Sequence, residues 1–183
     1  MVLAVKVCCD VNAPVDVMWD TLRDVKNQPN YLSRIIKVEF KKRSKNKGLV
    51  DVPPDDFVYE EGSLWIEESL FEGKPYQSIE SITSLRKPKA GNENPSVQIS
   101  SQFLDKKLSR AVHIGTYTIE ATEDKKKCRL HGSMGFLPGG CWAAFDMWRR
   151  RTQIRNFAQC FFQEQVNEFG AEAERRYANP TAK

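Results

Sequence analysis

The sequence has 183 residues, of which 40% are hydrophobic and 28% are charged, and its 28 Lys and Arg against 24 Asp and Glu give a formal net charge of +4. This composition excludes a disordered or collagen-like chain, and the length allows a sizeable core without disulfide support. The small positive charge does not predict nucleic-acid binding. No stretch approaches the roughly 20 apolar residues of a membrane span, so we expect a cytoplasmic protein.

A strand and a helix meet at an abrupt corner near the N-terminus. Residues 5–11 alternate apolar and polar side chains, as a half-buried strand does. In the following VNAPVDVMWDTL, Asn12 is a good N-cap and Pro14 suits the first helical turn. The apolar residues of 15–22 then fall on one helical face. A second helical turn is expected near residues 30–32.

Six further strands are predicted. Residues 36–40 alternate in polarity, and the basic, then acidic segment 41–62 is expected to be a solvated turn or irregular edge, because Pro53-Pro54 rules out a central strand. From residue 62 to 136, five strand patterns are separated by short turns at 72–74, 87–95, 105–110 and 123–127. Turns this short place consecutive strands side by side in an antiparallel meander, for a total of seven strands.

The C-terminal part predicts one long amphipathic helix. Residues 141–177 contain no proline, and Gly170 is a candidate fraying point. A curved sheet buries its concave face best by wrapping around such a helix. The fold class is therefore α+β: a seven-stranded antiparallel sheet wrapped around a C-terminal helix, in one domain over residues 1–177. Residues 178–183 are expected to be a disordered tail.

The opening segment VNAPVDVMWDTLRDVKNQPNYLSRIIKVEF resembles that of the START-like helix-grip superfamily, also called SRPBCC, of polyketide cyclase/dehydrase and lipid-transport type. Six residues match the pattern of the family's strand-to-helix corner: Ala13, Pro14, Met18, Trp19, Leu22 and Asp24. GSLWIEESLFEGKPY is similar to the family's third and fourth strands, and the resemblance covers residues 2–176.

The resemblance implies a cavity between the sheet and the long helix that accepts hydrophobic small molecules. The superfamily includes lipid and sterol carriers, quinone-binding proteins, hormone receptors, aromatase/cyclases and a cochaperone branch. The sequence departs from the family's usual pattern in two places. Segment 43–61 is long, and the closing helix is longer than is typical of the family.

Nothing in the sequence forms a recognisable catalytic or metal motif. His113 and His131 lie on predicted strands without a Ser/His/Asp or Cys/His arrangement around them, and the five cysteines have no zinc-like spacing, so we expect them to be buried and reduced. No acid stands in an apolar setting that predicts a raised pKa, although either Glu67 or Glu68 points inward. We expect no cofactor and no metal.

The long helix carries the most informative polar residue. On a continuous helix, Arg151 falls within the apolar stripe and Arg155 at its margin beside Trp148 and Phe162. Three partners for Arg151 stay open: an inward acid such as Glu68 or Glu80, solvent beyond the edge of the sheet, or the carboxylate, phosphate or carbonyl of a ligand.

The candidate ligand-binding residues combine this helix with strand aromatics that are expected to be partly core and partly cavity wall. They are Trp65, Tyr76, Phe103, Tyr117, Trp148, Arg151, Arg155, Ala158 and Phe162.

Three functions compete. The first is binding or transport of a lipid, sterol, quinone or polyketide-like molecule without catalysis. The second is a cyclase or dehydratase acting in the same cavity, and the third is a cochaperone-like interaction domain whose cavity is filled. The expected partner is a hydrophobic small molecule and not a nucleic acid. Arg149 and Arg150 near Trp142 are a candidate for transient membrane contact or a solvated helix face. The oligomeric state stays open.

Overall fold

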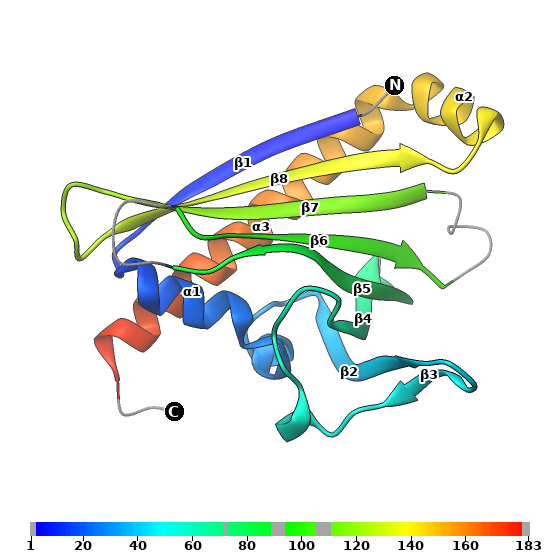
Figure 1. Cartoon of the computed structure of the whole chain (residues 1–183). Coiled ribbons are helices and arrows are strands. Elements are labelled where there is room, and N and C mark those ends of the chain that lie inside the picture. The colour runs from blue at the N-terminus through cyan, green and yellow to red at the C-terminus, as the bar shows by residue number, and fades with distance from the viewer. Residues whose placement is uncertain (1–2, 72, 89–93, 105–110, 181–183) are drawn as a thin grey trace.

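In a computed structural model that describes residues 3–71, 73–88, 94–104 and 111–180, one strongly curved sheet holds a long helix against its concave face (Figure 1). The elements in chain order are β1 (Leu3–Val11), α1 (Val15–Arg23), η1 (Val25–Asn30), β2 (Ile35–Ser44), β3 (Gly48–Asp51), η2 (Pro54–Asp56), β4 (Leu64–Phe71), β5 (Lys74–Arg86), β6 (Ser96–Phe103), β7 (Ala111–Ala121), β8 (Cys128–Pro138), α2 (Cys141–Arg149) and α3 (Arg151–Ala178).

The sheet is antiparallel throughout and has the order β1-β8-β7-β6-β5-β4-β2-β3 among the described residues. It contains eight strands rather than the seven predicted. The additional strand is β3, which lies at the sheet edge inside the segment that was expected to be irregular. Gly48 turns the chain at a φ of 72°, a conformation that glycine adopts without a steric penalty, so β3 pairs back onto β2 from Lys41 to Ser44.

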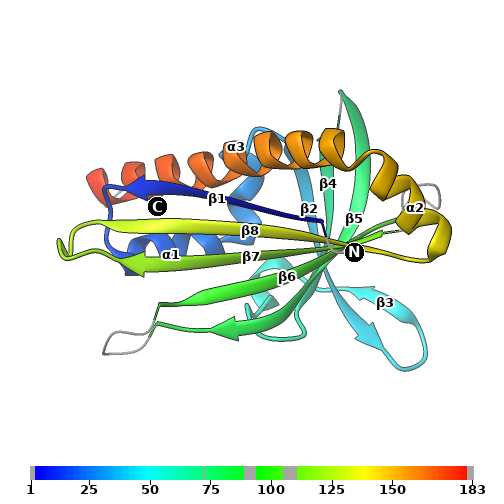
Figure 2. The same cartoon turned by 90° about the horizontal axis from the view of Figure 1, so that it is seen from above.

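Helix α3 packs tightly on β1 and β8 (Figure 2) because small residues let the backbones approach each other. A Cβ at Gly132 of β8 would lie only 2.8 Å from Cε1 of Phe162 and 2.9 Å from Cγ2 of Val166. A Cβ at Gly170 of α3 would lie 3.0 Å from Sγ of Cys9. Gly170 is therefore a buried contact point inside the helix and not a fraying point, which corrects the sequence-based expectation.

Polar side chains of α3 fasten it to the segment after α1. Glu164 pairs with Arg34 at 2.6 Å, and Glu168 one turn later accepts the backbone N–H of Ser33 at 3.2 Å. Near the end of the helix, Arg176 binds Asp24 at 2.7 Å. The helix is thus fixed to the sheet along one side and to the α1–η1 segment along the other.

The expected N-cap is wrong in its detail. Helix α1 begins at Val15 with Pro14 in the N-cap position, and its first turn receives no side-chain cap. Asn12 instead donates its backbone and side-chain N–H groups to Oε1 of Glu174 in α3, at 2.7 and 3.0 Å. Asn12 therefore stabilises the corner through a tertiary contact with the last helix.

The predicted helix 141–177 is broken at Arg150, whose φ of −100° and ψ of 11° end α2 before α3 begins. Helix α2 turns away at one end of the sheet, where Met147 packs with Val5, Phe136 and Ala158 in a small second core. The break changes the direction in which the residues of α2 point relative to those of α3.

Several other expectations meet the structure only in part. All five cysteines are free, but only Cys128 is buried and Cys9 half-buried, so the expectation of buried thiols is wrong for the other three. Helix α3 extends to Ala178, the first residue of the expected tail. Four expected segments lie wholly or partly outside the described residues: the tail at 181–183, the turn 105–110, and two other turns at 72 and 89–93. No helix in the described ranges has both the length and the apolarity to cross a membrane.

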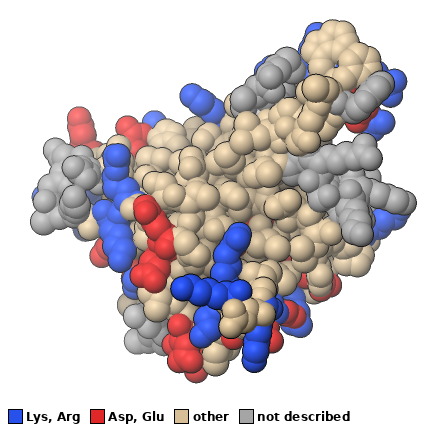
Figure 3. All heavy atoms as spheres, turned by 45° about the vertical axis from the view of Figure 1, so that its right-hand side comes forward, with Lys and Arg blue, Asp and Glu red and all other residues tan. Residues whose placement is uncertain are grey.

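The face of the molecule shown in Figure 3, on which α2 lies, carries charges of both signs. Lys and Arg side chains alternate with Asp and Glu in its lower half, and a broad area without charged side chains lies above them. The described residues of this face do not form the continuous basic surface that is typical of nucleic-acid binding.

We expect Gly132→Ala to destabilise the protein even though alanine is the better strand residue. The added methyl group must displace Phe162 and Val166, and overpacking of this kind costs about 1–3 kcal/mol. Gly115→Ala is the control, because its Cβ meets only the backbone oxygen of Ile99 at 3.9 Å. Urea unfolding should show a lower midpoint for the Gly132 variant alone, and equal midpoints would show that α3 does not pack as closely as described.

Candidate ligand-binding site

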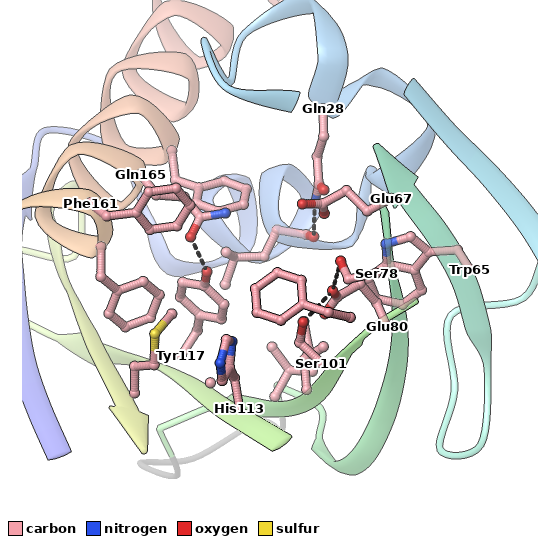
Figure 4. A pocket seen from close by; sticks show the side chains of 18 of the residues that line it. Gln28, Trp65, Glu67, Ser78, Glu80, Ser101, His113, Tyr117, Phe161 and Gln165 are labelled. Atoms are coloured by element: carbon pink, nitrogen blue, oxygen red, sulfur yellow. Dashed lines mark hydrogen bonds between the residues drawn. The ribbon is translucent and has the colours of Figure 1, made fainter. Parts of the chain in front are cut away.

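A cavity of about 100 Å³ lies between α3 and the concave face of strands β4–β8. Strand alternation explains how its polar and aromatic residues come together, because every second side chain points to the same face. Trp65 and Glu67 are two residues apart on β4 and therefore share a face. Tyr76, Ser78 and Glu80 have the same spacing on β5. The side chains labelled in Figure 4 among these, Trp65, Glu67, Ser78 and Glu80, converge on the interior.

The opposite wall comes from β6, β7 and α3. Phe103 and His113 stack edge to face at 4.8 Å between ring centroids, and Phe162 and Gln165 reach down from the helix. The Tyr117 hydroxyl donates to Oε1 of Gln165 at 2.9 Å and so ties the sheet to the helix across the cavity. The space that remains is enclosed by aromatic rings with a few polar groups among them.

Glu67 and Glu80, the carboxyl pair, are the chemically distinctive feature of this cavity. Ser78 and Ser101 both donate to Oε1 of Glu80, at 2.7 and 2.6 Å, and Ser69 donates to Oε1 of Glu67 at 2.5 Å. Glu67 keeps some accessible surface because it faces the cavity, but protein atoms surround both carboxyls.

Burial raises the pKa of both members of the carboxyl pair. For Glu80 the loss of solvation is the largest cause and the negative charge of Glu67 adds to it, which brings its pKa to about 8 in spite of the two serine hydroxyls. For Glu67 the loss of solvation also outweighs the Ser69 hydrogen bond and the nearby Trp65 indole, both of which favour its charged form. The pair therefore holds at least one proton at neutral pH.

The indole N–H of Trp65 lies close to these carboxyls but makes no hydrogen bond of acceptable geometry within the described residues. The side chain is only 2% exposed. A buried donor without a partner costs free energy of about 1–3 kcal/mol, so an acceptor atom in the cavity would be stabilising.

The remaining titratable groups on the cavity wall are neutral near pH 7. Burial lowers the pKa of His113 to about 4, and it raises the pKa of Tyr59, Tyr76 and Tyr117, the second of these to about 12. No described lining residue is Lys or Arg. The described residues also include no group of three or more side chains arranged to hold a metal ion.

Five of the nine candidate residues from the sequence line this cavity. They are Trp65, Tyr76, Phe103, Tyr117 and Phe162. Each belongs to a strand or helix face whose periodicity is regular, which is why its inward direction could be predicted. Their contact with a ligand stays a prediction.

The structure places the other four away from the cavity, which corrects the helical-wheel interpretation. Arg151 and Arg155 are exposed, and Arg151 lies over the ring of Trp148, itself 51% exposed, at 5.4 Å. Ala158 is buried in the second core beside Met147. Arg151, Arg155 and Ala158 share the continuous helix α3 with Phe162, so the break at Arg150 turns only Trp148 relative to them. The wheel gave the face of each residue but not whether that face is covered, and residues 151–157 are exposed except for the half-buried Ile154. Of the three partners considered for Arg151, the structure shows the solvated arrangement.

The expectation that no acid stands in an apolar setting is wrong. A usable signal was present, because Ser78 and Glu80 follow the inward Tyr76 at intervals of two residues on β5. The same alternation places His113 on the inner face with Tyr117, while His131 points outward and pairs with Glu120 at 2.7 Å.

Comparison with known proteins gives structural matches only, since no protein-family model and no curated protein sequence matches this chain. The Zhui aromatase/cyclase of Streptomyces sp. R1128 superposes with a TM-score of 0.69 at 14% identity over 100% of both chains. The chain has the helix-grip fold. The sequence-based prediction of that fold is thereby confirmed.

Two further matches have related shapes. The di-domain ARO/CYC StfQ of the steffimycin biosynthetic pathway gives a TM-score of 0.66 at 13% identity, over 97% of this chain and 53% of that one. Truncated norcoclaurine synthase from Thalictrum flavum gives 0.62 at 11% identity, over 94% and 93%. At these identities the similarity concerns the fold, and the side chains of this cavity have to be interpreted in their own right.

The protonated state of Glu80 predicts that stability falls as pH rises. Its pKa is about 8 in the folded chain and about 4.3 in an unfolded one, so between these values the folded state binds more protons than the unfolded state does. We expect the free energy of unfolding to decrease by a few kcal/mol, as an order of magnitude, from pH 5 to pH 8.5.

Glu80→Gln should remove most of this decrease, because the amide stays neutral and can still accept from the two serines. Urea unfolding at pH 5 and pH 8.5 measures the effect. The same pH dependence in the variant and in the unmodified chain would mean that Glu80 is not buried in its protonated form.

Proposed function

We propose that this chain binds a small, largely apolar molecule in the cavity between α3 and the sheet. The observation that carries the proposal is a partly open cavity of about 100 Å³ whose walls are largely aromatic and whose polar groups converge on one region. The buried indole N–H of Trp65, which makes no hydrogen bond of acceptable geometry within the described residues, supports it, because an acceptor atom on a ligand could bind this group.

The size of the cavity restricts the ligand. An apolar cavity of roughly 150 Å³ can hold a benzene molecule, so a space of about 100 Å³ limits the ligand to a body of at most one ring, and even that body requires small shifts of the lining side chains. A sterol, a lipid chain or a polyketide requires the walls to move apart. The names of the structural neighbours, an aromatase/cyclase and a synthase, agree with a small-molecule site in this fold and do not specify a substrate here.

Acid–base catalysis is a second candidate, and the carboxyl pair is the observation that favours it. A carboxylic acid that keeps its proton at neutral pH can act as a general acid toward a bound substrate, and an ionised neighbour can act as a base. For any neutral cyclisable substrate that the protein turns over, we expect Glu80→Gln and Glu67→Gln to abolish turnover and to leave the dissociation constant within about threefold. Unchanged turnover in both variants would exclude this candidate.

A cochaperone-like domain with a filled cavity receives less support. The interior retains a void, and the groups that border it include carboxyls and an unpartnered donor rather than a closed apolar core.

Filling the cavity should abolish binding without unfolding the protein. Gly115 lies on the inner face of β7, where a Cβ has room, so Gly115→Val places two methyl groups in the void. We expect toluene and benzyl alcohol, followed through the indole N–H signal of Trp65 by NMR, to bind at least about tenfold more weakly to this variant.

Thr118→Val is the matched control, because its side chain lies on the opposite face of the same strand. This control should bind like the unmodified chain. Equal affinity of all three proteins for both probes would contradict a binding site in the cavity.

A further inference from the structure

We propose that the carboxyl pair selects ligands that carry a protonated amine on a small apolar body, and that the amine lies between Glu67 and Glu80. This inference rests on the proposed binding function and adds the chemical class of the ligand.

The charge on the cavity wall favours a cation. The carboxyl pair is acidic, the other titratable lining groups are neutral near pH 7, and no described lining residue is Lys or Arg. The groups that act on the two carboxyls are each other, serine hydroxyls and the Trp65 indole, with no cation among them. A ligand ammonium would supply the missing countercharge, whereas a carboxylate or phosphate would add a negative charge beside two carboxyls that already raise each other's cost of ionisation.

The hydrogen-bonding capacity of the pair also fits an ammonium group, which has donors only. The hydroxyls of Ser78 and Ser101 both donate to Oε1 of Glu80. Oε2 is therefore left to accept a hydrogen bond from a ligand. The same hydrogen bonds fix the direction of the carboxyl before a ligand arrives, which reduces the entropy cost of binding.

Aromatic rings complete the surroundings that such a ligand needs. Tyr59, Trp65, Tyr76 and Phe103 line the cavity with the carboxyl pair, and the faces of such rings attract cations that have lost their water. The rings also cover the apolar body of the ligand. Carboxylates together with aromatic walls are a better match to an organic cation than to an inorganic one.

The indole N–H of Trp65 is an independent sign that the cavity is built to be filled. It is buried beside the carboxyls and lacks a hydrogen-bond partner. A ligand with an oxygen acceptor near its amine would bind this N–H and the pair at once.

Binding of an ammonium changes the proton content of the pair. The pair holds a proton at neutral pH, and an incoming ammonium favours the ionised form, so that proton leaves the carboxyl for the solvent. Affinity for an amine should therefore rise from pH 6 to pH 8, by up to about tenfold for each pH unit below the pKa of about 8. The affinity of a neutral ligand should change little over that range.

Three probes of similar size separate the possibilities: benzylamine, which stays protonated over this pH range, neutral benzyl alcohol and anionic benzoate. We expect benzylamine to bind at least about tenfold more tightly than benzyl alcohol at pH 8, and benzoate to bind most weakly. The readouts are the Trp65 indole signal in NMR titrations and proton release by calorimetry in buffers of different ionisation enthalpy.

Glu67→Gln and Glu80→Gln should each remove the preference for benzylamine and retain binding of benzyl alcohol. Glu68→Gln is the matched control, because Glu68 is the next residue on β4, points to the other face and binds Gln77 at 3.3 Å. Proton release by the unmodified chain tests the proposal even where a variant fails to fold.

Equal affinity for benzylamine and benzyl alcohol, or binding of benzylamine without proton release, overturns the amine proposal and leaves the binding function intact. Failure of all three probes to bind overturns the proposed function and the amine proposal together.

Discussion

The close packing of α3 on β1 and β8 is the constraint on which the rest of the structure depends. Gly132 and Gly170 remove the side chains that would keep the helix at a distance, and polar side chains of α3 fasten it to the segment after α1. The helix is therefore held at one edge of a curved sheet and stands away from strands β4–β7. The cavity results from this larger distance between the helix and strands β4–β7. It does not require small side chains in the core.

The polar content of the cavity has a cost that the rest of the fold offsets. Two carboxyls taken from water lose solvation free energy, and an indole N–H remains without a partner. Serine hydroxyls recover part of this loss at Glu80. Sites that sacrifice stability in this way are often those that bind or transform a ligand. The same three groups explain why a ligand with both donors and an acceptor would stabilise the protein.

Periodicity in the sequence was sufficient for most elements and for about half of the candidate site. Apolar and polar alternation predicted seven of the eight described strands and the inward direction of Trp65, Tyr76 and Tyr117. The same rule applied to Tyr76 leads directly to Glu80, so that acid could have been found. Arg151 could not be placed, because a helical wheel gives the face on which a residue lies but not whether another element covers that face, and the first turn of α3 is exposed. Asn12 has the properties of a cap, and only the position of Glu174 explains its actual role.

The sequence by itself determined which residues share a face, because alternation along a strand and rotation along a helix are local properties of the backbone. It therefore determined the curved antiparallel sheet and its closing helix. Only the tertiary structure decided how far the helix stands from each strand, where it breaks, and how much water the two glutamates lose. The position of the helix depends on contacts between segments more than 100 residues apart, such as Val7 with Gly132 and Cys9 with Gly170. The raised pKa values of the two glutamates have burial as their largest cause, and burial is a property of the whole tertiary structure.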